Sequence, residues 1–160
     1  MADYTVREAT ADEMPFVRDS WARSWLDVST RSQPLQRPPR GLARWLWIRA
    51  YREGVIGQIL ETDGARVVVA QIPDVEGEVL GWICYTEPGE HPLQVHYIYV
   101  KPYARRRRIG TGLLRVVLSK AGARRGVVTH HTKSGDKLLW SARESVGEDT
   151  VPIEVGEQAS

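Results

Sequence analysis

The chain has 160 residues, of which 42% are hydrophobic and 26% charged; this is typical of one globular domain over residues 1–160 and excludes a disordered protein. The net charge of +2 is too small to imply a polyanionic partner, and the single cysteine, Cys84, excludes an internal disulfide and a zinc site built of cysteines. No apolar run approaches the roughly 20 residues that span a bilayer, and the N-terminus lacks the basic and apolar regions of a secretory signal. We therefore expect a cytoplasmic protein that does not enter a membrane.

The first part of the chain is predicted to contain a short strand and a long helix. Residues 5–10 (TVREAT) have the pattern of a strand. Thr10 and Glu13 have the spacing of a capping box, which predicts that a helix starts there and continues over residues 10–28 with one apolar face. Three prolines within residues 29–41 then predict a loop.

A second helix is expected over residues 42–52, followed by a short connection that contains Gly54 and Gly57. The middle of the chain is rich in β-branched and aromatic residues and is interrupted twice by turn residues. This pattern predicts an antiparallel meander of three strands, at residues 65–72, 78–87 and 93–100.

The C-terminal part is predicted to add a helix and a parallel strand. From Gly110 to Gly122 leucines and valines lie on one helical face, and Gly122 is a suitable stop. A strand at 126–132 follows that helix, so the crossover requires it to lie parallel to the strand at 93–100. The remaining residues are expected to form a short helix and a last strand, at 135–145 and 151–155.

The densest positive charge is a run of four arginines between a strand that ends at Val100 and a helix that begins near Gly110. Helix N-termini expose backbone N–H groups, glycine lets a phosphate approach the backbone, and arginines add charge-assisted hydrogen bonds. The junction therefore favours a phosphate-binding site. No Gly-Lys-Ser/Thr follows, which excludes a Walker loop, and the preceding meander excludes the dinucleotide fingerprint. The alternatives are a solvated turn and a nonspecific nucleic-acid patch.

Residues 100–114 (VKPYARRRRIGTGLL) resemble the coenzyme A-binding signature of the GNAT N-acetyltransferase superfamily, with Arg105, Arg108 and Gly110 on its arginine and two glycine positions. The segments GEVLGWICY and TVREATADEM resemble the family's central hairpin and its opening strand and helix. The resemblance extends from Tyr4 to about Thr129, in the family's order of elements. It implies an α/β fold with a GNAT-like mixed central sheet flanked by helices. In that sheet an antiparallel meander is followed by a parallel pair, which is splayed at the cofactor cleft.

The resemblance also implies that acetyl-CoA is the acyl donor. The residues expected to bind it are Ile98, Tyr99, Val100, Arg105, Arg106, Arg107, Arg108, Ile109, Gly110, Thr111 and Gly112. Two features depart from the family pattern. Arg108 replaces the first glycine, and Ser134 and Trp140 lie near the place of a tyrosine that protonates the departing thiolate. Tryptophan has no ionisable hydroxyl and cannot supply that proton.

The implied mechanism is direct attack of a neutral amine on the thioester in a ternary complex. Gln94 lies where the family often has a carboxylate base, and an amide cannot act as one. His96 lies two residues on, on the same face, and is expected to be the base; the alternative is a hydrogen-bonded histidine that lines the sheet. Tyr97 and Tyr99 should lie on the opposite face from His96 and pack against a helix. A strand bulge would instead turn one of them, Tyr97 being the candidate, into the cleft as a proton donor.

In this superfamily the first two helices usually form the acceptor side, so Trp21 and Trp25 are expected to bind the substrate. Tryptophans four residues apart on a helix are nevertheless more often part of the core. The acceptor is expected to be an amine on a small molecule, a protein or a modified nucleobase. The nucleobase is included because the Trp-rich first helix, the segment HYIYV and the reduced C-terminus together are similar to short bacteriophage GNAT-like proteins. No metal is expected, since adjacent His130 and His131 on a strand would point to opposite faces.

Two other functions stay open at this point. One is a GNAT-fold coenzyme A-binding protein that has lost catalysis, which Gln94, Arg108 and the missing tyrosine favour. The other is a nucleic-acid-binding protein that uses the arginine run. An exposed sheet edge at the C-terminus is compatible with a homodimer.

Overall fold

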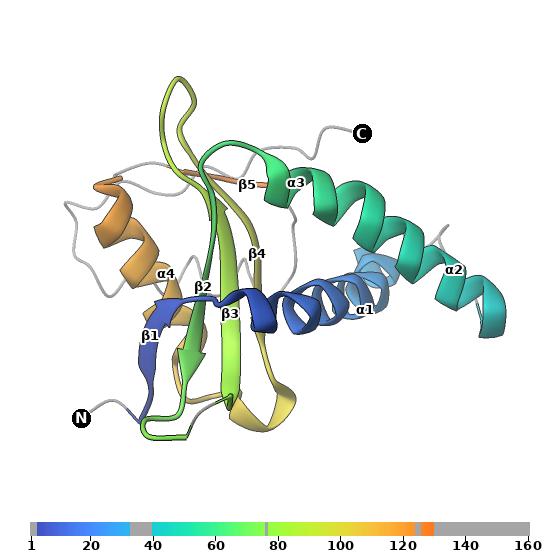
Figure 1. Ribbon diagram of the computed structural model, residues 1–160, viewed down its shortest axis with the longest axis horizontal. Coiled ribbons are helices and arrows are strands. Elements are labelled where there is room, and N and C mark those ends of the chain that lie inside the picture. Colours follow the sequence, from blue (N-terminus) through green and yellow to red (C-terminus); the bar gives the residue numbers. More distant parts are fainter. Residues whose placement is uncertain (1–2, 33–39, 76, 124–125, 130–160) are drawn as a thin grey trace. The chain divides into compact units, whose positions relative to one another are not determined.

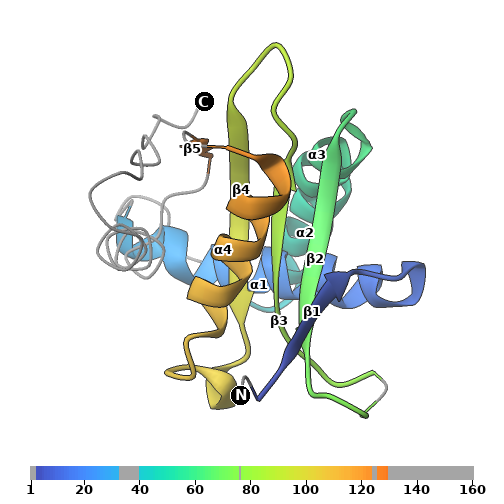
Figure 2. The same cartoon turned by 90° about the vertical axis from the view of Figure 1, so that its left-hand side faces the viewer.

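The computed structural model describes residues 3–32, 40–75, 77–123 and 126–129. These residues form two compact units (Figures 1 and 2): a helical unit from Thr10 to Asp63, and a unit that holds the whole sheet and the helix between its fourth and fifth strands. The single domain over residues 1–160 stays a prediction. No helix in the described ranges is both long and apolar enough to cross a membrane.

The helical unit begins with a capped turn. The Thr10 N–H donates to the Glu13 carboxylate at 2.8 Å, and the predicted capping box is confirmed. A 3-10 turn, Ala11–Glu13, leads into helix α1, Met14–Ser32. The helix therefore continues past its predicted end at residue 28 and into the segment that was expected to form a loop.

The second helix does not end before Gly54 and Gly57, and the predicted connection there is wrong. Helix α2, Gly41–Tyr51, continues through a π-helical turn, Arg52–Ile56, into helix α3, Gly57–Glu61. Glycine lowers the stability of a helix by only about 1 kcal/mol relative to alanine and keeps its backbone N–H, whereas proline would remove one. The two glycines therefore weaken this helix without ending it.

The second unit contains a five-stranded mixed sheet in the order β1-β2-β3-β4-β5. The first four strands pair antiparallel with their neighbours, and β5 pairs parallel with β4. The strands are β1 (Thr5–Glu8), β2 (Ala65–Gln71), β3 (Val79–Thr86), β4 (Leu93–Val100) and β5 (Gly126–Val128). The predicted meander and the predicted parallel pair are both confirmed. The helix and strand expected at 135–145 and 151–155 lie outside the described residues.

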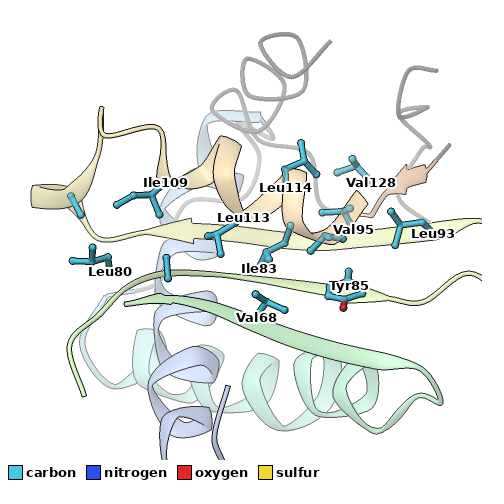
Figure 3. Close-up of a cluster of buried hydrophobic side chains, with 13 residues drawn as sticks. Val68, Leu80, Ile83, Tyr85, Leu93, Val95, Ile109, Leu113, Leu114 and Val128 are labelled. Carbon is cyan, nitrogen blue, oxygen red and sulfur yellow. The ribbon is translucent and has the colours of Figure 1, made fainter. Parts of the chain in front are cut away.

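Helix α4, Ile109–Ala121, packs on one face of this sheet (Figure 2). Its fully buried Leu113 and Val117 meet strand residues such as Ile83 in one apolar cluster (Figure 3). Each such side chain contributes about 1.5–3 kcal/mol when it leaves water. The helix ends at Gly122, whose φ of 56° confirms the predicted glycine stop. The core thus fixes α4, and with it the loop that precedes the helix, against the sheet.

Candidate active site

The described part of β5 pairs with only the first residues of β4 (Figure 2). Strand β5 pairs only with Leu93–Val95, and the Thr129 N–H then donates to the Val95 carbonyl at 3.1 Å. No other described strand pairs with β4 on that side. Among the residues that the structure describes, β4 therefore has no partner on this side from His96 to Val100, and we call this stretch the open edge of β4.

The backbone groups that face this open edge belong to Ile98 and Val100. On the other side of β4 the Lys101 N–H donates to the Leu80 carbonyl at 2.8 Å, and hydrogen-bonded pairs alternate along an antiparallel ladder. The tyrosines of β4 therefore pair with β3, whereas Ile98 and Val100 direct their peptide groups away from it.

A bulge interrupts β4 at His96. Cys84 lies opposite Tyr97 and Tyr85 lies opposite Val95, so His96 is an extra residue without a partner on β3. Val95 and Ile98, three residues apart, consequently both face α4. His96 and Tyr97 lie together on the face away from α4, as the partners of their side chains show below. The expectation that Tyr97 faces away from His96 is therefore wrong, because simple alternation fails at a bulge.

The His96 side chain is only 6% exposed and lies between two threonines. Its Nε2 is 2.8 Å from the Thr86 Oγ1, and its Nδ1 is 2.9 Å from the Thr129 Oγ1. Burial lowers the pKa of His96 to about 4, because it disfavours the charged form of the ring. The imidazole is therefore neutral at physiological pH, with both ring nitrogens within hydrogen-bonding distance of a hydroxyl.

Aromatic rings form a layer on the same face of the sheet. The Trp82 ring centroid lies 5.7 Å from that of Tyr97 and 6.0 Å from that of Tyr99. Trp82 is fully buried and Tyr97 is 5% exposed. The neighbouring Cys84 is also buried, which raises the pKa of its thiol to about 12. Cys84 therefore stays protonated and is unsuited to be a nucleophile.

The arginine loop connects β4 to α4 through a short 3-10 turn, Pro102–Ala104. Arg106 and Arg108 have φ of 70° and 59°, in the left-handed region, and alternate with residues of negative φ. Such alternation turns successive N–H groups toward one side and makes an anion-binding concavity. Arg108 stands at the glycine position of the signature, and its backbone adopts the conformation that glycine would allow most easily.

The N-terminus of α4 has backbone N–H groups available for an anion. Its N-cap, Arg108, makes no side-chain capping bond, and the first intrahelical bond runs from the Gly112 N–H to the Arg108 carbonyl at 3.0 Å. The N–H groups of Ile109, Gly110 and Thr111 precede that bond and have no partner within the helix. Together with the positive end of the helix dipole, they favour a phosphate oxygen.

The side chains of the loop add positive charge to this end of the helix. All four arginines are exposed, and none forms an ion pair with another residue that the structure describes. Arg105 donates from Nε to the Val100 carbonyl at 3.2 Å, which ties the loop to the end of the open edge. Exposed guanidinium groups beside free N–H groups suit a phosphorylated ligand.

Tyr4, to which the sequence assigns no role in the site, lies against the start of α4. Its hydroxyl donates to the Arg108 carbonyl at 3.3 Å, across 104 positions of sequence. A Cβ on Gly112 would lie 1.9 Å from that hydroxyl oxygen. Gly112 was expected to approach the cofactor. The packing of Tyr4 is a separate reason for glycine at this position, because a larger side chain would clash with the tyrosine. No local pattern signals a contact between residues so far apart in the chain.

This arrangement agrees with comparisons to known proteins. The family model described as the acetyltransferase (GNAT) family matches residues 18–137, well over half of the chain. The chain belongs to the GNAT acetyltransferase family. Among curated proteins, none matches it.

Solved structures share the GNAT fold at low sequence identity. The candidate acetyltransferase YycN of Bacillus subtilis has a TM-score of 0.62 and 13% identity, with 98% of this chain and 99% of that chain covered. A candidate acetyl transferase of Pyrococcus furiosus has a TM-score of 0.56 and 19% identity, covering 94% and 97%. An aminoglycoside acetyltransferase from a soil metagenome, in complex with sisomicin, has a TM-score of 0.51 and 12% identity, covering 95% of each chain.

The tryptophans of the helical unit differ in their surroundings. Trp21 is fully buried and Trp25 is 8% exposed, which favours the core alternative for both. On α2, Trp45 is 50% exposed and carries the Arg49 guanidinium 5.5 Å from its ring centroid. Trp47 stacks on Tyr51 at 5.0 Å. An exposed aromatic side chain of the helical unit is therefore found on α2.

Several expected features of the GNAT chain lie outside the described residues. They are His130, His131, Ser134 and Trp140. Within the part of the chain that is described, no group of three or more histidine, cysteine, aspartate or glutamate residues is arranged to hold a metal ion.

Proposed function

We propose that this chain is an N-acetyltransferase that binds acetyl-CoA along the open edge of β4 and transfers the acetyl group directly to an amine. The observation that carries the proposal is the arginine loop at the end of that edge. It combines an uncapped helix N-terminus, two left-handed arginines and four exposed guanidinium groups. The residues therefore fit a ligand that carries a diphosphate.

Each part of the proposed donor site has a separate task. The N–H groups at the start of α4, with Arg106 and Arg107, bind the phosphates. The peptide group of Val100 hydrogen-bonds to the amide-containing arm of the donor, as an added strand would. The Ile98 N–H stabilises the oxyanion that forms when the amine attacks the thioester. The amine nitrogen then bonds to the thioester carbon, the C–S bond breaks, and the amine loses a proton while the thiolate gains one. We propose Tyr97, on the same face as His96, as the donor of the proton to the thiolate.

The acceptor is an amine in this proposal, with small molecules, proteins and amino-modified nucleobases as candidate carriers. The aminoglycoside acetyltransferase among the similar structures supports the inclusion of aminoglycosides in a panel of acceptors.

A second function has specific support. A GNAT-fold protein that binds acetyl-CoA without catalysis is favoured by Gln94 at the place of a carboxylate and by the two threonines that engage His96. Binding without release of free coenzyme A across the panel of amines identifies this function.

The test is calorimetry with acetyl-CoA. Loss of a charge-assisted hydrogen bond costs about 1.5 kcal/mol, so Arg106→Ala and Arg107→Ala should each weaken binding about tenfold. Arg115→Ala is the matched control, because Arg115 is an exposed arginine further along the same helix. Wild-type protein that binds no acetyl-CoA, or loop variants that bind as tightly as the control, would refute the proposal. Thiol release with each amine then measures turnover.

A further inference from the structure

His96 connects three segments of the sheet at the place where the described pairing of β4 with β5 ends. Its ring lies between Thr86, the last residue of β3, and Thr129, the first residue after β5. His96 is itself the extra residue of the β4 bulge. One side chain therefore links the two neighbouring strands through the strand that lies between them.

We propose that His96 is a positioning residue that fixes the β4 bulge and the direction of the Ile98 peptide N–H toward the thioester of acetyl-CoA, and that it does not accept the proton of the amine. The inference rests on the proposed function. It replaces the expectation from the sequence that His96 is the base.

The hydrogen bonds of the ring argue against a base. A neutral imidazole has one N–H and one lone pair, and each threonine hydroxyl both donates and accepts. With hydroxyls at 2.8 and 2.9 Å, one threonine donates to the lone pair and the other accepts from the N–H. A general base must present its lone pair to the proton it takes, directly or through one water. Here a hydroxyl of the protein already occupies that lone pair.

The surroundings of the His96 ring also argue against its role as a base. His96 is 6% exposed, and burial alone accounts for the lowered pKa of the ring. The side chains that face its nitrogens are uncharged threonines, so no described carboxylate stabilises an imidazolium there. A proton taken up by His96 would therefore break a hydrogen bond and leave a buried charge without a counter-ion.

The position of the bulge explains what the ring holds. Ile98 is the first residue after the bulge whose peptide N–H points away from β3, toward the open edge. In the proposed function that N–H stabilises the oxyanion of the reaction, and removal of one such donor costs about 10²–10³-fold in rate. A shift of β4 by about 1 Å costs a similar factor, about 10²-fold. His96 holds β4 two residues before Ile98. Loss of this contact is therefore expected to lower the rate of the reaction.

The experiment removes the hydroxyls and the ring separately. Thr86→Val and Thr129→Val keep the shape of each side chain, and we expect a raised KM for acetyl-CoA and a lowered kcat, together up to about 10²-fold in kcat/KM. The apparent pKa values of the pH profile should stay unchanged. His96→Gln keeps a donor and an acceptor and should retain more activity than His96→Leu. Thr62→Val is the control, because that hydroxyl bonds to the Gln58 carbonyl one helical turn earlier.

The opposite result identifies a base. If His96→Gln lowered kcat by about 10²–10⁴-fold with an unchanged KM and removed the acid limb of the pH profile, the positioning role would be overturned. Nitrogen NMR of the wild-type ring gives a second test that needs no variant to fold. The ring should stay neutral from pH 8 to below pH 5. A ring that titrates near neutral pH overturns only the role of His96, whereas wild-type protein that binds no acetyl-CoA overturns the proposed function as well.

Discussion

Replacing Arg108 by glycine should stabilise the protein relative to replacing it by alanine. Arg108 has φ 59° and ψ 24°. A residue with a Cβ pays roughly 1–2 kcal/mol in this left-handed conformation, whereas glycine pays about 0.5–1 kcal/mol in extra chain entropy wherever it is placed. The free energy of unfolding of the Arg108→Gly variant should therefore be about 0.5–1 kcal/mol larger than that of the Arg108→Ala variant. Both variants lose the same charge, so the comparison isolates the backbone.

Arg115 supplies the opposite case. It is exposed in the interior of α4, where glycine is about 1 kcal/mol less favourable than alanine. Urea unfolding followed by tryptophan fluorescence should therefore give differences of opposite sign at the two positions. A difference of 1 kcal/mol corresponds to about 2–4 °C in Tm for a chain of this size. If the glycine variant were less stable than the alanine variant at both Arg108 and Arg115, the left-handed conformation of Arg108 would be refuted.

Three further outcomes follow from close contacts and buried groups. Gly112→Ala should lower the free energy of unfolding by about 1–3 kcal/mol because of the clash with Tyr4, and a Tyr4→Ala background should turn the same change into a gain of about 1 kcal/mol in denaturant unfolding. The Cys84 thiol ionises more readily in the unfolded chain, so the free energy of unfolding should fall as pH rises from about 9 toward about 12. The Cys84→Ala variant should lose less stability than the wild type between pH 8 and pH 10. His96 takes up a proton at a higher pH in the unfolded chain than in the folded protein, so the free energy of unfolding should fall as pH drops from about 6.5 to about 4. The His96→Gln variant should not show this decrease. An equal decrease in the variant would contradict the lowered pKa of His96.

The elements with a strong repeating pattern were predicted with their bounds. Strand β4 spans the expected residues 93–100, and the capping box at Thr10 and the stop at Gly122 are both present. These signals are local, because a hydrophobic period or a cap depends on residues within one or two turns. The helix through Gly54 and Gly57 was not predicted, because glycine has a low local preference for helix. Packing in the folded chain overrides a preference of only about 1 kcal/mol, and a local pattern does not show that packing.

The candidate site was predicted only where it follows from the order of elements. The loop at Arg105–Arg108 follows a strand and precedes a helix, and the sequence shows both. A bulge in β4 was considered only as the alternative that would turn Tyr97 toward the cleft. The sequence did not decide it, because one extra residue changes neither composition nor pattern but reverses which face the preceding residues occupy. The contact of Tyr4 with Gly112 joins distant segments and leaves no trace in either of them.

Two departures from regular backbone geometry lie at the two ends of the open edge of β4. At one end the bulge leaves His96 without a partner on β3, and at the other Arg106 and Arg108 adopt left-handed conformations. After its own entropy cost, glycine at either arginine position would be more stable by about 0.5–1 kcal/mol, so arginine there lowers stability and adds charge. Backbone strain of this kind persists where the rest of the fold holds it in place and where it serves a site. The buried face of α4 supplies that support, because it fixes the helix start next to the loop. The arginines are thus better explained by an anionic ligand than by solubility, which exposed arginines in ordinary helical positions would provide at no cost.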